Sequence, residues 1–327
     1  MECDYPVRVL KAGTRSKKGK VYNEDVLVRC GYCYPCRISR LRQWIFRLRQ
    51  EEKQHTKAYF VTLTYSPKTV PITQNGFMSL HAPTKVWNEK KQKMISKSSD
   101  LQIYFKNLRN SYRYMYKGKW KYDKVPLIKY YAVGEYGTKG ESIGYGRPHY
   151  HALIFGADED NIVESWRLLN QHAGDVYIGA VTEASIAYTL TYMITKSGID
   201  KKHKRDDRVK EYSIMSKGIG QAYIEDKNVK QFYKTNPLNM SILQEDGTRI
   251  GLPKYYRDYL YKTEIINEQG KKEIIVEPLF DDKTKANQAH HVQDVILPEL
   301  ELKDRRTDIQ KRNTLIANAK KIKSSKH

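Results

Sequence analysis

The sequence of 327 residues is poor in cysteine and has no long apolar stretch. Only four cysteines are present, and three of them lie between residues 30 and 36, which is not the dispersed pattern of a disulfide framework in a secreted domain. No run is apolar over the roughly 18 residues that a membrane-spanning helix needs, and the N-terminus lacks the charged and then apolar pattern of a secretory signal. We therefore expect a soluble protein that has no membrane partner and stays where it is made.

Positive charge is what the sequence has in excess. Lys and Arg number 59 against 37 Asp and Glu, which gives a formal net charge of +22. Such an imbalance destabilises a compact fold by self-repulsion unless a polyanion shares its surface, so nucleic acid is the expected partner. The 26 tyrosines offer stacking faces with polar tips that suit single-stranded bases, although half-exposed sheet edges account for most of them. No glycine-rich phosphate loop followed by Lys and Ser or Thr occurs, which argues against a nucleotide-driven motor.

The most informative stretch is residues 147–155, where His149 and His151 are separated by one bulky residue on an apolar strand. Side chains two positions apart share one face of a strand, so the two imidazoles can bind a single metal ion. Glu135 ends the preceding predicted strand and should lie opposite His149 across the hairpin, which makes it the best candidate for a third ligand. Imidazole ligands suit Mn²⁺ better than Mg²⁺, although Mg²⁺ remains a candidate for the physiological ion. The alternative is a pair of core histidines that bind no metal.

A second candidate group lies about 40 residues further on. Tyr188, Tyr192 and Lys196 recur at i, i+4 and i+8 in a segment, 183–197, that is predicted to be a helix. The apolar side chains of this helix fall on about the opposite side, so the tyrosines can face the metal site. A metal and a tyrosine nucleophile together indicate chemistry on a phosphodiester, with the Lys196 ammonium helping to stabilise a phenolate. A tyrosine pair one helical turn apart is otherwise more often simple packing.

The cysteines form a third group. Cys3, Cys30, Cys33 and Cys36 match a tetrahedral zinc site, since the closely spaced cysteines supply paired ligands and Cys3 folds the N-terminal arm back over them. An iron–sulfur cluster and unligated thiols are the alternatives. The segment that follows carries an apolar stripe at helical spacing among many arginines, so the zinc-binding element should anchor a basic helix.

Three motifs in this order resemble those of the HUH rolling-circle replication initiators. They are Phe60-Val-Thr-Leu-Thr-Tyr65, then Gly134-Glu135-Tyr-Gly137 with Arg147-Pro-His149-Tyr-His151, then Tyr188-x-x-x-Tyr192-x-x-x-Lys196. Within that superfamily the Cys-rich N-terminus and the two tyrosines are most similar to the replication-associated proteins of the microviruses, especially the gokushovirus branch. The resemblance covers about residues 1–225.

The resemblance implies an α+β fold, in which an RRM-like antiparallel sheet has helices packed on one face, the HUH endonuclease fold. To this we add an N-terminal Cys-rich zinc-binding element and a basic C-terminal extension. We expect a Cys-rich element with a basic helix at 1–56, an HUH endonuclease core at 57–200 and a C-terminal basic region of unknown role at 201–327. Residues 66–97 should form a loop-rich insertion, and helices should begin at Asp100 and span about 161–170.

The activity that the resemblance implies is that of a metal-dependent, site-specific single-stranded DNA endonuclease and strand transferase. Tyr188 or Tyr192 would attack the origin strand of a phage replicative form and stay joined to the 5′ end, and the freed 3′ hydroxyl would prime a host polymerase. The other tyrosine would later cut the regenerated origin, so that the strand is rejoined into a circle. Thr62 and Thr64 are expected to support the sheet behind the site.

Partners and location follow from the same resemblance. We expect single-stranded and origin DNA as partners, a host helicase because the chain lacks a motor motif, and action in the cytoplasm of a bacterial host cell. A conjugative relaxase or a single-strand transposase of the same superfamily fits less well. A zinc-stabilised protein that binds single-stranded nucleic acid without catalysis is the alternative from another class.

Overall fold

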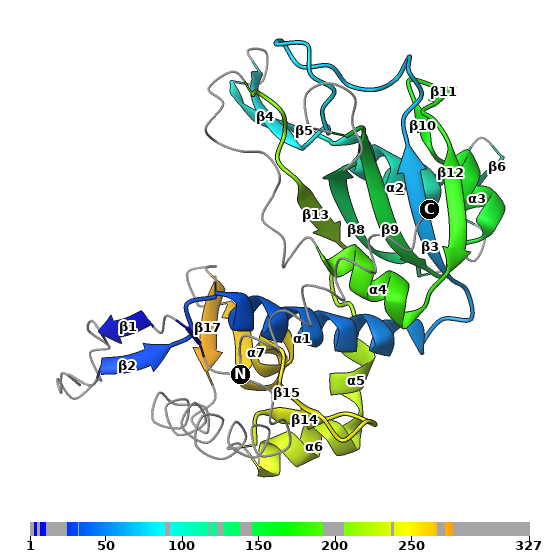
Figure 1. The fold of residues 1–327 in the computed structure, drawn as a ribbon. Coiled ribbons are helices and arrows are strands. Elements are labelled where there is room, and N and C mark those ends of the chain that lie inside the picture. The colour runs from blue at the N-terminus through cyan, green and yellow to red at the C-terminus, as the bar shows by residue number, and fades with distance from the viewer. Residues whose placement is uncertain are drawn as a thin grey trace. The chain divides into compact units, whose positions relative to one another are not determined.

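The chain divides into two compact units, each described here by itself (Figure 1). The computed structural model describes residues 3–4, 7–10, 25–31, 33–88, 92–117, 119–122, 127–137, 146–191, 206–236, 239–266 and 272–276. The first unit combines the two ends of the chain, Met1–Gln50 and Gly220–His327, and the second is Glu51–Ile219. The expected segments 1–56, 57–200 and 201–327 stay a prediction, because packing within the whole chain does not test which pieces fold alone.

A five-stranded antiparallel sheet with the order β12-β3-β9-β8-β13 forms the centre of the second unit (Figure 1). Its strands are β3 (Ala58–Thr64), β8 (Lys129–Tyr136), β9 (Pro148–Phe155), β12 (Val176–Ala180) and β13 (Tyr212–Met215). The first four lie where the sequence predicts strands, and the antiparallel pairing of β8 with β9 is confirmed. The α+β class is therefore correct.

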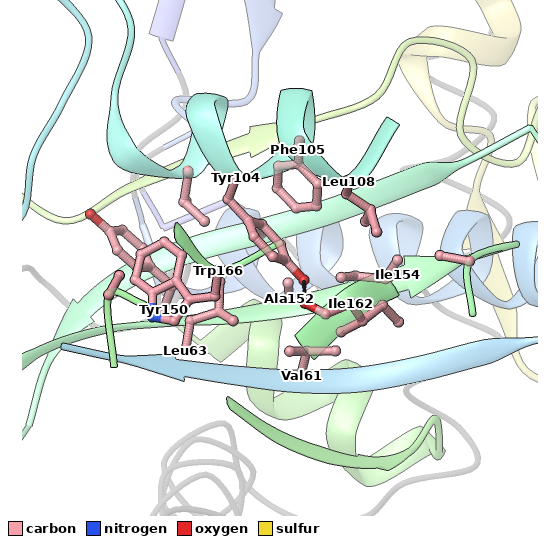
Figure 2. Close-up of a cluster of buried hydrophobic side chains, with 14 of the residues drawn as sticks. Val61, Leu63, Tyr104, Phe105, Leu108, Tyr150, Ala152, Ile154, Ile162 and Trp166 are labelled. Carbon is pink, nitrogen blue, oxygen red and sulfur yellow. Dashed lines mark hydrogen bonds between the residues drawn. The ribbon is translucent and has the colours of Figure 1, made fainter. Parts of the chain in front are cut away.

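The core lies on one face of this sheet, beneath α2 (Asp100–Asn110) and α3 (Glu159–Glu164). Strand side chains alternate between the faces, so every second residue of β3 and β9 enters the core. Figure 2 shows these residues with those of α2 and the loop after α3: Val61, Leu63, Tyr104, Phe105, Leu108, Tyr150, Ala152, Ile154, Ile162 and Trp166. The fully buried Trp166 donates its indole N–H to the Thr64 carbonyl at 2.8 Å, which ties the core to β3.

The opposite face of the sheet is covered in part by α4 (Glu183–Leu190), which contacts β9. The expectation of helices on one face only is therefore wrong. The reason lies in β9, where Leu153 and Phe155 of the second face are as completely buried as Ala152 and Ile154 of the first. A strand that is apolar on both faces requires cover on both. The predicted helix 183–197 is described as far as Leu190, and its remainder lies outside the described residues.

Three other local predictions need correction. Part of the expected loop at 66–97 is a hairpin of β4 (Thr84–Asn88) and β5 (Lys93–Lys97). The helix expected at 161–170 ends at Glu164, because a second hairpin, β10 (Arg167–Leu168) and β11 (Gln171–His172), follows it. Its turn residues Leu169 and Asn170 have φ of 50° and 64°, a left-handed conformation that ends any helix. The N-cap of α2 is Ser99 and not Asp100.

The first unit has a smaller core of its own. The predicted basic helix is present as α1 (Tyr34–Glu52), with Ile38 and Leu48 buried. Phe46 packs with Tyr256 of α7 (Lys254–Tyr261), at the site where the sequence predicts a helix or turn. The remaining elements of the chain are β1 (Val7–Leu10), β2 (Asp25–Val28), β6 (Arg113–Tyr116), β7 (Lys119–Tyr122), α5 (Gln221–Glu225), α6 (Lys227–Thr235), β14 (Ser241–Leu243), β15 (Arg249–Gly251), β16 (Lys262–Ile266) and β17 (Lys272–Val276). Among the helices of the described residues, none combines the length and the apolar character needed to cross a lipid bilayer.

The cap of α2 leads to a test of the fold. The Ser99 hydroxyl accepts the Gln102 backbone N–H at 3.2 Å, and the Gln102 side chain accepts the Ser99 N–H at 3.0 Å. Ser99→Ala should lower the free energy of unfolding by about 1 kcal/mol, because these helix-end donors lose their acceptor. Urea denaturation measures this loss, with the exposed neighbour Ser98→Ala as the matched control. Equal losses for the two variants would show that the cap is assigned wrongly.

Candidate active site

Three side chains that the sequence predicts as metal ligands come together on the α4 face of the sheet. Glu135 lies on β8 directly opposite His149 of β9, as expected, and His151 follows two positions along the same strand. Glu135 Oε1 is 3.3 Å from His149 Nε2 and 3.0 Å from His151 Nε2. One carboxylate oxygen and one nitrogen of each imidazole lie within 4.8 Å of one another, a spacing that a single metal ion can bridge.

The second nitrogen of each imidazole has a partner that sets the ring orientation. His149 Nδ1 lies 3.0 Å from the Arg147 carbonyl oxygen, and His151 Nδ1 lies 2.9 Å from Thr62 Oγ1. Thr62 is the residue of β3 that pairs directly with His151 across the sheet. Both histidines therefore present Nε2 to Glu135, in the arrangement that outer partners impose on metal-binding histidines.

This arrangement requires positive charge between the three side chains. The Arg147 carbonyl only accepts, so His149 Nδ1 carries a hydrogen, and in neutral imidazole the lone pair of Nε2 then faces the carboxylate oxygen of Glu135. Two lone pairs at this distance repel each other. Either a proton on Nε2 or a cation among the three groups removes the repulsion, so the donor set fits a divalent ion.

The electrostatics of Glu135 agree with such a site. Burial alone would raise the pKa of this carboxyl group, but the hydrogen bonds and charges of His149 and His151 outweigh burial and hold its pKa well below the usual range. Glu135 is therefore a carboxylate at neutral pH although it is only 7% exposed. A buried anion held by two imidazoles is a strong ligand for a hard or intermediate cation.

Tyr188 brings a nucleophile to the same group. Its hydroxyl donates to Glu135 Oε1 at 2.8 Å and lies 3.4 Å from His151 Nε2. Burial raises the pKa of the phenol, and the charge of Glu135 and the hydrogen bond to it raise it further, so the hydroxyl keeps its proton in this state. Tyr192 and Lys196, the other predicted catalytic residues, lie outside the described residues.

Phe60 and Thr62 of β3 are parts of the site for which the sequence predicted no direct contact. The Phe60 ring stacks on His151 with centroids 5.4 Å apart and meets Tyr188 edge-on at 6.3 Å. Thr62 was expected to support the sheet, whereas its hydroxyl contacts the imidazole of His151 itself. The alternation of β3 places residues 60, 62 and 64 on one face, which is a usable signal, but only the sheet order shows that this face meets the histidines.

The predicted cysteine ligands also come together, in the first unit. The sulfurs of Cys3, Cys30, Cys33 and Cys36 lie within 4.8 Å of one another. Burial and then the neighbouring thiols raise the pKa of Cys36 to about 12, so without a cation the thiols of this group resist ionisation.

Comparison with known proteins identifies the region that holds the site. A model of a family of replication-associated proteins, of the ORF2 type, matches residues 58–197. The match begins with β3 and ends beyond α4, so it includes Glu135, His149, His151 and Tyr188 and leaves the cysteines outside. No curated protein and no solved structure matches the chain.

The depressed pKa of Glu135 predicts a pH dependence of stability. A carboxyl group whose pKa is lower in the folded state stabilises the fold above its ordinary pKa of 4.5, and this contribution is lost as the pH falls below that value. In the presence of a chelator, wild type should be more stable than Glu135→Gln at pH 7, and the difference should shrink below about pH 4.5. Urea denaturation at several pH values measures it, with the exposed Glu159→Gln as control. A difference that stays constant down to pH 3 would contradict the assigned interaction.

Proposed function

Residues 58–197 belong to the ORF2-type family of replication-associated proteins, the microvirus-type rolling-circle replication initiators, and from this we propose that the chain nicks the origin strand of a phage replicative form. Family membership by itself indicates a DNA-binding protein with a role in starting replication. Our proposal adds the chemistry, a metal-assisted attack by a tyrosine within an HUH-type fold. The proposed place of action is the cytoplasm of the bacterial host cell.

One observation supports the proposal more than any other, namely that the Tyr188 hydroxyl lies within hydrogen-bond distance of Glu135 and close to His151. A nucleophile beside a candidate metal site is the arrangement that phosphodiester cleavage needs. The +22 net charge of the chain supplies attraction for a polyanionic substrate.

Glu135, His149 and His151 would hold the ion, for which Mn²⁺ and Mg²⁺ are the proposed candidates. When bound, the ion would supply positive charge that neutralises the non-bridging oxygens of the scissile phosphate and leave coordination positions open to them. Because three protein ligands from two adjacent strands hold their positions by sheet pairing, little reorganisation is needed when the ion and the phosphate bind.

Tyr188 performs the proposed cleavage step. Its Oη forms a bond to phosphorus as the bond from phosphorus to the 3′ oxygen breaks, so the 5′ end becomes attached to Tyr188. The proton that the phenol releases is balanced by the one that the 3′ oxygen takes up, which leaves a 3′ hydroxyl for a host polymerase. Since its pKa is raised in the described state, the phenol stays unreactive until its hydrogen bond to Glu135 is exchanged for contact with the substrate.

The later steps rest on residues outside the described part of the chain. Tyr192 is the proposed second nucleophile for the cut that ends one round of replication, after which the strand is rejoined into a circle. Lys196 is proposed to lower the cost of forming a phenolate. A host helicase is the proposed partner for strand separation.

A covalent adduct tests the proposal directly. Purified protein incubated with single-stranded origin DNA and Mn²⁺ should form a DNA adduct that survives denaturing electrophoresis and maps to Tyr188 by mass spectrometry. Tyr188→Phe should lose that adduct, because a phenyl ring has no nucleophilic oxygen. Tyr177→Phe is the matched control, since this tyrosine is 61% exposed on β12 of the same sheet. Tight DNA binding without any adduct would instead favour the non-catalytic alternative.

Thr62 is proposed to position His151 for the ion. An imidazole that binds metal through Nε2 carries its hydrogen on Nδ1, and Thr62 Oγ1 is placed to accept it. Thr64 offers a matched comparison, because it pairs with His149 in the same way but donates its hydroxyl to the Asp175 carbonyl.

Thr62→Val should therefore raise the Mn²⁺ concentration needed for half-maximal nicking by roughly 10-fold or more, with the rate at saturating Mn²⁺ much less affected. Thr64→Val should leave both values near those of wild type, and Thr62→Ser should restore much of the affinity. Metal titrations of the nicking rate measure these changes. Equal effects of the two valine variants would mean that Thr62 only supports the sheet.

A further inference from the structure

The four cysteines of the first unit form a compact group that includes none of the proposed catalytic residues. Cys33 and Cys36 are 8% and 6% exposed, and Cys3 and Cys30 are half-buried. All four sulfurs lie within 4.8 Å of one another, and those of Cys3 and Cys33 are 3.7 Å apart. Four ligands at about 2.3 Å from one tetrahedral ion lie roughly 3.8 Å from each other, so this spacing matches a shared ion.

Backbone donors point at three of the sulfurs. The N–H of Cys30 donates to Cys3 Sγ and the N–H of Cys33 donates to Cys30 Sγ, both at 3.3 Å. The N–H of Gly31 donates to Cys36. Gly31 has a φ of +77°, a conformation that glycine adopts without strain, and it places the turn around the sulfurs. Such donors suit thiolates far better than neutral thiols, which are weak acceptors.

We propose that Cys3, Cys30, Cys33 and Cys36 bind one structural Zn²⁺ as a tetrathiolate. Soft thiolate ligands in a closed tetrahedral set select zinc, whereas the carboxylate and imidazoles of the proposed catalytic site suit Mn²⁺ or Mg²⁺. The cysteines of an iron–sulfur cluster are distributed over several iron atoms, so their sulfurs stand farther apart than ligands of a single ion. The observed spacing therefore favours one ion over a cluster.

The position of the ligands in the chain gives the ion a structural role. Cys3 precedes β1 (Val7–Leu10) and Cys30 follows β2 (Asp25–Val28), so the open end of this two-stranded hairpin meets at the ion. Cys36 lies in the first turn of α1. A two-stranded hairpin alone has marginal stability. The ion joins the hairpin to the start of α1, and its binding energy contributes to the stability of the first unit.

Metal analysis of the full-length protein tests this inference without any use of nicking activity. Protein expressed with zinc and iron in the medium and dialysed against a mild chelator should retain about one zinc per chain by elemental analysis. X-ray absorption should show four sulfur ligands at about 2.3 Å. Cys36→Ser and Cys3→Ser should lose the zinc and lower the melting temperature, whereas the control His149→Ala should keep it.

Replacement of zinc by Co²⁺ provides a second measurement in case the cysteine variants fail to fold. Wild-type protein refolded with Co²⁺ should show the absorption of a tetrahedral cobalt thiolate, and addition of Zn²⁺ should abolish it. Zinc-free protein with four reactive thiols, iron in place of zinc, or loss of the zinc in His149→Ala would each overturn the proposal. Because none of these results depends on DNA cleavage, they stand whether or not the proposed nuclease activity is found.

Discussion

The register of β9 with its two neighbours is the constraint on which the candidate site depends. Pairing with β8 sets Glu135 against His149, and pairing with β3 sets Thr62 against His151. A slip of one residue in either ladder would turn both histidines into the core and bring Tyr150 out in their place. The site therefore needs no loop to hold it, because backbone hydrogen bonds within a sheet place every described member except Tyr188.

The same register is secured from the core side by the residue between the histidines. Tyr150 is fully buried, and its hydroxyl lies 2.7 Å from that of Tyr65, which in turn donates to Asp100 at 2.7 Å. Asp100 also contacts His81 Nδ1 at 2.6 Å, so a chain of polar groups crosses the core under the site. Leaving any of these buried groups without its partner would cost free energy, so the network opposes a shift of β9.

The site also shows how one carboxylate sets the state of its neighbours. Glu135 stays ionised although buried, because two imidazoles lie against it, and its charge together with burial keeps the Tyr188 phenol protonated. These opposite pKa shifts belong to one cluster of touching groups. A cation among Glu135 and the histidines would change the balance for Tyr188 as well, which links the proposed ligands to the proposed nucleophile.

The strands that carry the site, the basic helix α1 and the pairing of Glu135 with His149 could all be predicted from the sequence, because they follow from local alternation, helical spacing and a hairpin between neighbouring segments. The sequence also marked the four cysteines as one group, since ligand type and spacing are local properties. Three-dimensional packing was needed to show that β3 lies beside β9, that α4 covers the second face and that Thr62 and Phe60 touch His151. These features depend on contacts between residues about 90 positions or more apart in some cases, as between Thr62 and His151, and periodicity within one segment carries no information about which distant segment it will pair with.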